Sequence, residues 1–136
     1  MIQIRPSTAA DVPLILHLVR ELAEFERAAD KVVATEPLLH DALFGPHPAA
    51  EAVIAELDGK SVGMALFFHN FSTWTGWRGL YLEDLYVTPE ARGSGVGKAL
   101  LRHLAALAVE RGLSPRRGYA APLPGMMFCR KLPFVS

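Results

Sequence analysis

Apolar and polar positions follow two periods along the first 112 residues, and each period predicts a kind of element. Alternation of apolar and polar residues predicts a short strand at positions 1–5. The apolar-rich segments 52–57, 61–69 and 80–87 are predicted to be strands as well. Between the second and third of these strands stands Asp58-Gly59, a favoured turn for a two-stranded hairpin. The pattern therefore predicts a sheet that contains one tight hairpin.

Three segments place apolar residues three and four positions apart, which predicts amphipathic helices. Ser7 or Thr8 can cap the first helix, which runs to about residue 27, and Thr35 followed by Pro37 opens a second helix that ends near Gly45. A third helix is expected from about residue 95 to 111. The apolar face of the first helix consists of Val12, Ile15, Leu16, Leu18, Val19 and Leu22.

The composition fits one domain that is large enough to fold around its own core. The chain has 136 residues, of which 51% are hydrophobic, and a single cysteine, Cys129, which can form no internal disulfide. No apolar run approaches the ~20 residues that span a bilayer, and the N-terminus lacks the basic and apolar regions of a secretion signal. A net charge of zero gives no reason to expect nucleic acid as a partner. We expect a cytoplasmic protein with neither membrane nor nucleic acid as a partner.

Metal binding is not expected either, because the five histidines show no metal-ligand spacing. They are His17, His40, His47, His69 and His103.

The neutral total hides an uneven distribution of charge. Residues 1–110 hold all 14 acidic residues and nine of the 14 basic ones, a net charge of −5, whereas residues 111–136 hold five basic residues and no acid. This last segment also contains four prolines and shows neither helical nor strand periodicity. We therefore divide the chain into a domain over residues 1–112 and an atypical, proline-rich basic tail over residues 113–136.

A glycine-rich turn separates the strand at 80–87 from the third helix. Gly93, Gly95 and Gly97 stand at alternate positions, which lets consecutive backbone N–H groups converge. The first turn of the helix adds unpaired N–H donors and the positive end of the helix dipole. This arrangement predicts a pyrophosphate site, although an ordinary strand-turn-helix would also use glycines for a tight turn.

The spacing of the turn excludes two familiar nucleotide motifs. A Walker A loop requires Gly-Lys-Ser/Thr, but Lys98 is followed by Ala99, so the magnesium-binding hydroxyl is missing. A dinucleotide fingerprint requires G-x-G-x-x-G, whereas this turn reads G-x-G-x-G, and no acidic residue stands about 20 positions further on.

The remaining pattern is R-x-x-G-x-G after a strand that carries acidic residues, and it closely resembles the coenzyme A signature of the GNAT superfamily of N-acetyltransferases. The strand at 80–87, Leu-Tyr-Leu-Glu-Asp-Leu-Tyr-Val, looks most like the diamine (spermidine/spermine) and thialysine acetyltransferase branch. The order of elements matches the first two-thirds of that fold. The resemblance implies an α/β (α+β) fold whose central mixed, mostly antiparallel sheet is flanked by helices and is incomplete at the C-terminus.

The same resemblance implies acetyl-coenzyme A as the acetyl donor and assigns residues to it. The backbone of the last strand residues would bind the pantetheine arm, and the glycine turn would bind the pyrophosphate, with two basic side chains complementing its charge. The expected cofactor-binding residues are Leu85, Tyr86, Val87, Arg92, Gly93, Ser94, Gly95, Val96, Gly97 and Lys98.

An amine with a pKa of about 10.4 is protonated at neutral pH, so a site that uses it as a nucleophile must bind the cation and remove a proton. The resemblance assigns Glu83 to this catalytic role, directly or through a water, and Asp84 as a second acidic contact. As neighbours on a strand, the two should point to opposite faces. A charge inside an apolar strand is costly, which favours a functional role over a solvated face. Glu26 and Trp74 align with substrate-side positions, although a solvated charge at the helix end explains Glu26 equally well.

The tail departs from the family, whose members continue with a strand and a helix that carries a Phe-Tyr pair. That tyrosine protonates the leaving thiolate, but Tyr119 stands in the wrong context, so no general acid is assigned. We expect the tail to leave an edge of the sheet exposed. We hypothesise a frame change or a truncated gene, with a genuine tail that folds in a variant way as the alternative.

Two functions stay open. The first is acetyl transfer to a small polyamine-like or lysine-like amine, directly within a ternary complex, by a homodimer. The second is a catalytically inactive protein that only binds coenzyme A or pairs with another subunit.

Overall fold

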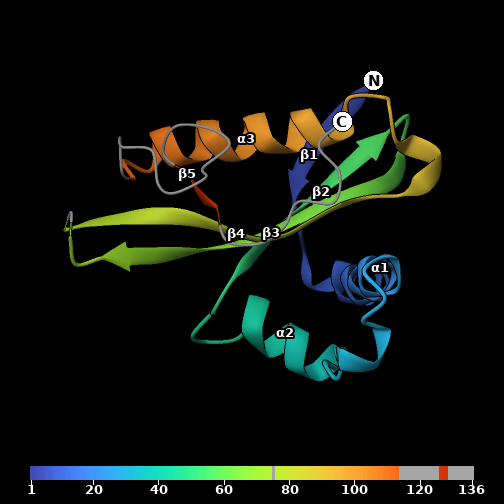
Figure 1. Ribbon diagram of the computed structural model, residues 1–136, viewed down its shortest axis with the longest axis horizontal. Helices are drawn as coiled ribbons and strands as arrows, with labels where there is room; N and C mark the ends of the chain where they lie inside the picture. Colours follow the sequence, from blue (N-terminus) through green and yellow to red (C-terminus); the bar gives the residue numbers. More distant parts are fainter. Residues whose placement is uncertain (75, 114–125, 129–136) are drawn as a thin grey trace.

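The computed structural model describes residues 1–74, 76–113 and 126–128. A five-stranded sheet in the order β1-β2-β3-β4-β5 forms the middle layer, with α3 on one face and α1 and α2 on the other (Figure 1). Neighbouring strands are antiparallel except β4 and β5, which are parallel. The elements are β1 (Ile2–Pro6), α1 (Val12–Phe25), α2 (Glu36–Phe44), β2 (Glu51–Leu57), β3 (Lys60–Ser72), β4 (Trp77–Val87), α3 (Val96–Glu110) and β5 (Met126–Phe128).

Seven of these elements confirm the prediction from the hydrophobic pattern, and the hairpin turn is confirmed in detail. Asp58 and Gly59 connect β2 to β3 with φ angles of 52° and 83°, the positive pair that a two-residue turn of this kind requires. The first helix begins later than expected, because Thr8 and Asp11 close a 3-10 turn, η1 (Ala9–Asp11), ahead of α1.

The strands β3 and β4 are longer than the sequence pattern indicates. They pair as far as Ser72 with Trp77 and form a hairpin arm that extends beyond the helical layers (Figure 1). Alternation fades in this arm because few of its side chains reach the core. Trp74 lies in the turn at its tip and is 90% exposed.

The core consists of two clusters on the two faces of the sheet. One joins the sheet to α3 through Phe67, Leu80, Leu82, Leu85, Val87, Leu100 and Leu104. The other joins it to α1 and α2 through Ile15, Leu18, Leu22, Leu43, Ile54, Met64, Leu66 and Tyr86. The helix α1 thus buries most of the apolar face that its sequence predicts, namely Val12, Ile15, Leu16, Leu18 and Leu22.

The strand β5 is the one element that the sequence pattern missed. It pairs with Leu80–Leu82 of β4, so this part of the β4 edge is covered rather than exposed as expected. The rest of the tail, including Tyr119 and Cys129, lies outside the described residues. The division at residue 112 and the hypothesis of a non-native ending thus stay predictions.

An ion-pair cluster fastens the N-terminal strand to the start of the α1 layer. The Arg5 guanidinium donates to both carboxylate oxygens of Asp11, at 2.8 and 2.9 Å, and to Glu56 on β2 at 3.2 Å. The Asp11 carboxylate also accepts from the backbone N–H of Thr8 at 2.7 Å. These contacts, chiefly the hydrogen bonds from Arg5, lower the pKa of Asp11 to about 2.

Replacing Asp11 with Asn should lower the free energy of unfolding by about 1–3 kcal/mol, because a half-buried charge-assisted network is lost. A carboxyl whose pKa is lowered on folding stabilises the protein above its unfolded pKa, near 3.8, and that contribution disappears as pH falls towards 2. Urea unfolding at pH 7, 4 and 2.5 measures both effects. Asp30→Asn, an exposed aspartate on the 3-10 turn η2 (Ala29–Lys31), is the control. Identical acid sensitivity of wild type and D11N would contradict the assignment.

Candidate functional site

A β-bulge interrupts the pairing of β3 with β4 at the acidic pair. Leu66 pairs with Asp84, but the next residue of β3, Phe67, pairs with Leu82. Glu83 is therefore the extra residue on β4. Bulges of this kind bend a strand and change the direction of the side chains around them, and they are frequent beside active sites.

The bulge changes which residues of β4 face each helical layer. Before the bulge, Leu80 and Leu82 pack in the cluster on the α3 side. The next residue of β4 in that cluster is Leu85, which is three positions after Leu82, whereas regular alternation would place it two positions after. Tyr86 instead packs on the α1 side. Neighbouring side chains on a strand point to opposite faces, so Glu83, which follows Leu82, points to the α1 face. Asp84 stands two positions before Tyr86 and therefore points to the same α1 face.

The expectation that the two carboxylates point to opposite faces is wrong, because it assumed an unbroken strand. Both side chains are half-buried. A signal for the bulge exists in the sequence: the apolar positions of β4 change from even numbers at Leu80 and Leu82 to odd numbers at Leu85 and Val87.

A cavity of about 270 Å³ opens on this α1 face. Asp84 contributes from β4, Glu26 from the end of α1, and Lys31 from η2. The remaining lining residues are Val19, Leu22, Ala23, Ala28 and Val32. The structure therefore brings together two of the predicted substrate-binding carboxylates, Asp84 and Glu26.

Two other predicted site residues do not line this cavity. Glu83 lies next to it in the bulge, on the same face as Asp84. Trp74 lies at the tip of the hairpin arm, and the six residue steps along β4 from Trp77 to Glu83 span about 20 Å. Within one chain, Trp74 is thus remote from the carboxylates. Lys31, in contrast, was not singled out by the sequence, because a lysine between two helices gives no signal.

Two of the three predicted turn glycines adopt a left-handed backbone, and the third, Gly97, lies in the first turn of α3. Gly93 and Gly95 adopt φ angles of 85° and 89°, which favour glycine over every other residue. A Cβ atom added to either would meet nothing within 4 Å, so these glycines leave open space above the turn. The conformation, and not crowding within the chain, explains why both positions are glycine.

The helix α3 begins at this turn without a side-chain cap. Gly95 is its N-cap residue, and in the first turn of the helix the Ala99 N–H donates to the carbonyl of Gly95. The N–H groups of Val96, Gly97 and Lys98 therefore have no acceptor within the helix. Together with the open space above the glycines and the exposed Lys98, these donors fit a pyrophosphate.

The side chain of Arg92 turns away from the open face of the turn and binds the body of the protein. Its Nε donates to the carbonyl of Val87 at 3.1 Å, and its guanidinium lies 5.3 Å from the ring centroid of Phe25 and 5.5 Å from that of Tyr86. Arg92 thus joins the glycine turn to α1 and β4. Its predicted role beside a phosphate stays a prediction.

Tyr86 extends this connection into α1. Its hydroxyl donates to Glu21 at 3.0 Å, and Glu21 also contacts His17 one turn earlier at 2.5 Å. Burial, followed by the hydrogen bond to Glu21, raises the pKa of Tyr86 to about 12. Tyr86 is therefore a neutral hydrogen-bond donor at physiological pH.

The two sides of β4 differ after the bulge. On one side, Leu85, Tyr86 and Val87 pair with Ala65, Met64 and Gly63 of β3. On the other side, the ladder with β5 ends at Leu82 in the part of the chain that the structure describes. The family resemblance predicts that an extended pantetheine arm pairs along this second side, where the Val87 carbonyl already accepts from Arg92.

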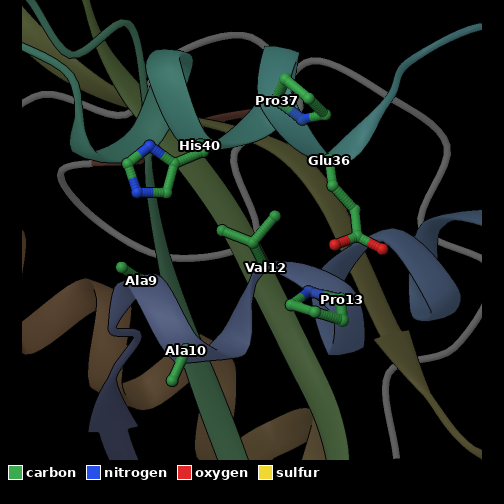
Figure 2. A pocket seen from close by; sticks show the side chains of 7 residues that line it. All are labelled: Ala9, Ala10, Val12, Pro13, Glu36, Pro37 and His40. Carbon is green, nitrogen blue, oxygen red and sulfur yellow. The ribbon is translucent and has the colours of Figure 1, made fainter.

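A second cavity, of about 470 Å³, lies between the start of α1 and the start of α2. Figure 2 shows Glu36 and His40 on α2 opposite Val12 and Pro13. Its lining contains no residue of the bulge or of the glycine turn, so it is separate from the candidate site.

In residues 1–74, 76–113 and 126–128, no three acidic, histidine or cysteine side chains gather closely enough to hold a metal ion. The helices among these residues are too short or too polar to cross a membrane.

Comparisons with known proteins agree with this geometry. Residues 16–120 match the model of the acetyltransferase (GNAT) family. Thialysine N-epsilon-acetyltransferase of Sus scrofa is 38% identical over 122 residues, which are 84% of this chain and 71% of that protein. Spermidine/spermine N(1)-acetyltransferase-like protein 1 of Homo sapiens is 40% identical over 115 residues, 79% of this chain but 16% of that protein.

Among solved structures, a ribosomal-protein-alanine N-acetyltransferase from Brucella melitensis biovar Abortus 2308 superposes with a TM-score of 0.68 at 27% identity. The match covers 96% of this chain and 81% of that one.

The glycine turn can be tested with two substitutions that strain the backbone alike. Gly95→Ala and Gly59→Ala both place a Cβ on a residue with positive φ and open surroundings, so each should cost about 1–2 kcal/mol of stability. Only Gly95→Ala should also weaken acetyl-coenzyme A binding, at least about tenfold, because its methyl group enters the space above the turn. Calorimetric titration and urea unfolding of both variants check this. Equal cofactor affinity in G95A and G59A would exclude the turn as the pyrophosphate site.

Proposed function

The chain belongs to the acetyltransferase (GNAT) family, whose members use acetyl-coenzyme A as the acetyl donor, and on that premise we propose the substrate and the roles of the residues. The acceptor is a primary amine of a small polyamine-like or lysine-like molecule. The observation that carries this proposal is the bulge, which gives one face of β4 two adjacent carboxylates, beside a cavity that also contains Glu26.

The carboxylates suit an amine substrate on electrostatic grounds. An ammonium group entering the cavity is attracted to Asp84 and Glu26, and it must lose a proton before its nitrogen can attack. Glu83 accepts that proton, directly or through one water, and Asp84 holds the amine in place. The names of two relatives, which refer to thialysine and to spermidine and spermine, support a cationic acceptor of this kind.

The glycine turn and the β4 edge fix the other reactant. The coenzyme supplies an activated thioester carbonyl and a thiolate leaving group. The N–H groups of the first turn of α3, with Lys98, bind its pyrophosphate, and the backbone of Leu85–Val87 aligns its extended arm. The amine nitrogen then forms a bond to the carbonyl carbon, the carbon–sulfur bond breaks, and the sulfur takes up a proton.

Direct transfer within a ternary complex is the mechanism that these side chains support. The site offers carboxylates that can accept a proton, and the Ser94 hydroxyl is already engaged with the Ala91 carbonyl. Acetylation of Glu83 or Asp84 would give a mixed anhydride, which is higher in energy than the thioester that it replaces, so these carboxylates favour direct transfer. We assign no general acid to the leaving thiolate.

The homodimer is proposed from the family resemblance alone. Sedimentation equilibrium of the purified chain tests it, with a mass of twice 14.8 kDa as the expected result.

Substituting Glu83 with Gln should reduce kcat about 10²–10⁴-fold with little change in acetyl-coenzyme A affinity, because the proton acceptor is lost while the turn is untouched. The residual rate should keep rising with pH towards about 10, as the deprotonated fraction of a simple amine grows. A thiol-release assay over pH 6–10, with lysine and spermidine as acceptors, measures this.

Asp84→Asn should raise KM for the amine more than it lowers kcat, and Glu90→Gln, an exposed glutamate, is the matched control. Equal rates in E83Q and wild type would remove Glu83 from the mechanism. A wild-type chain that binds acetyl-coenzyme A but acetylates no amine would instead support the inactive alternative.

A further inference from the structure

The cavity beside Asp84 carries charges of both signs. Two carboxylates, Asp84 and Glu26, and one ammonium, Lys31, line it around an apolar wall that includes Val19 and Leu22. A cavity meant only for polyamines, which carry cations and methylene groups, would be expected to hold acidic side chains alone. Lys31 repels such a ligand.

The chain path fixes Lys31 close to Glu26. After Phe25 the backbone reverses, with Arg27 at a φ of 57° and the Ala28 N–H bonded to the Ala23 carbonyl at 2.7 Å. The η2 turn follows at once, and the Lys31 N–H donates to the Ala28 carbonyl at 2.9 Å. Glu26 and Lys31 thus lie on either side of one tight turn, while Asp84 faces them from β4.

Neither charge at this turn is neutralised within the described part of the chain. The ion pairs of those residues include those of the Met1 ammonium, Arg5, His17, Lys60 and Arg111, but none that involves Lys31 or Glu26. Because Glu26 and Lys31 do not form an ion pair with each other, both can bind a ligand. The complementary ligand carries an ammonium group close to a carboxylate.

We propose that Lys31 is a specificity-determining residue, which selects a diamino acid over a polyamine as the acetyl acceptor. The inference rests on the proposed function and deepens it. An α-amino acid with a terminal amine carries two ammonium groups and one carboxylate. These charges are opposite in sign to those of Glu26, Asp84 and Lys31. Its α-carboxylate binds Lys31, its α-ammonium binds Glu26, and its terminal amine reaches Asp84 and Glu83 beside the thioester.

The size of the cavity agrees with this class of substrate. At about 270 Å³ it is smaller than the roughly 300–1,000 Å³ of pockets for drug-sized ligands. The apolar wall formed by Val19 and Leu22 suits the methylene chain that separates the two ends of a diamino acid.

L-lysine and cadaverine form a matched pair of ligands for the test, since they differ only by the α-carboxylate. Wild type should show the higher kcat/KM for lysine. Lys31→Met keeps the length of the side chain and removes its charge, so kcat/KM for lysine should fall roughly 10–100-fold, the effect of one charge-assisted hydrogen bond, while the value for cadaverine stays the same or rises. Lys31→Glu should favour cadaverine further. Lys60→Met, an exposed lysine at the start of β3, is the control and should change neither value.

The outcomes separate this inference from the proposed function. Acetylation of cadaverine at least as efficiently as lysine, with both values unaffected by K31M, keeps the transferase and overturns the role of Lys31. Calorimetric titration of wild type and K31M with each ligand tests the binding step even if the chain transfers no acetyl group. Lysine binding that K31M selectively loses supports the inference, and equal binding of lysine by the two proteins overturns it.

Discussion

The single extra residue in β4 is the constraint on which the rest of the site depends. With unbroken alternation, Asp84 would follow Leu80 and Leu82 into the α3 core, and the apolar Leu85 and Val87 would face α1. A buried, unpaired carboxylate would cost far more than the sheet gains from one regular pair. The bulge solves this by shifting the register once, so the core stays apolar on both sides while two acidic side chains share one face.

A second constraint joins that face to the glycine turn. The Arg92 guanidinium contacts Phe25 at the end of α1, the Tyr86 ring and the Val87 carbonyl, and Tyr86 itself donates to Glu21 of α1. The helix that forms one wall of the cavity is thus fastened to the strand and to the residue that precedes the glycines. Arg92, a residue of the R-x-x-G-x-G motif, thus has a structural role that is separate from its proposed contact with a phosphate.

The sequence predicts those features that are determined by a few consecutive residues, and it does not predict those that depend on contacts between distant segments. The helices, the Asp58-Gly59 hairpin and the glycine turn are determined by local chemistry: capping, periodicity and positive φ angles, all visible in a few residues. The orientation of Glu83 relative to Asp84 is determined by pairing with Leu66 and Phe67 of β3, so alternation within β4 alone gave the wrong answer. Lys31 and β5 were missed because their places depend on what they pack or pair against, and their own residues carry no periodicity.

The short path from the carboxylates to the glycines has a consequence for catalysis. Glu83 and Gly95 belong to one continuous stretch, which is held at Thr88, whose N–H donates to Val62 at 2.8 Å, and at Arg92 through Val87. The positions of the turn N–H groups, the proposed phosphate donors, and of Glu83, the proposed proton acceptor, are therefore set relative to each other by the chain itself. Reacting atoms must meet within a few tenths of an ångström, so a shift of the turn would move the thioester away from the amine as well as weaken its binding. Changes in the glycine turn should thus affect the rate of transfer at saturation, which a site assembled from independent parts would not require.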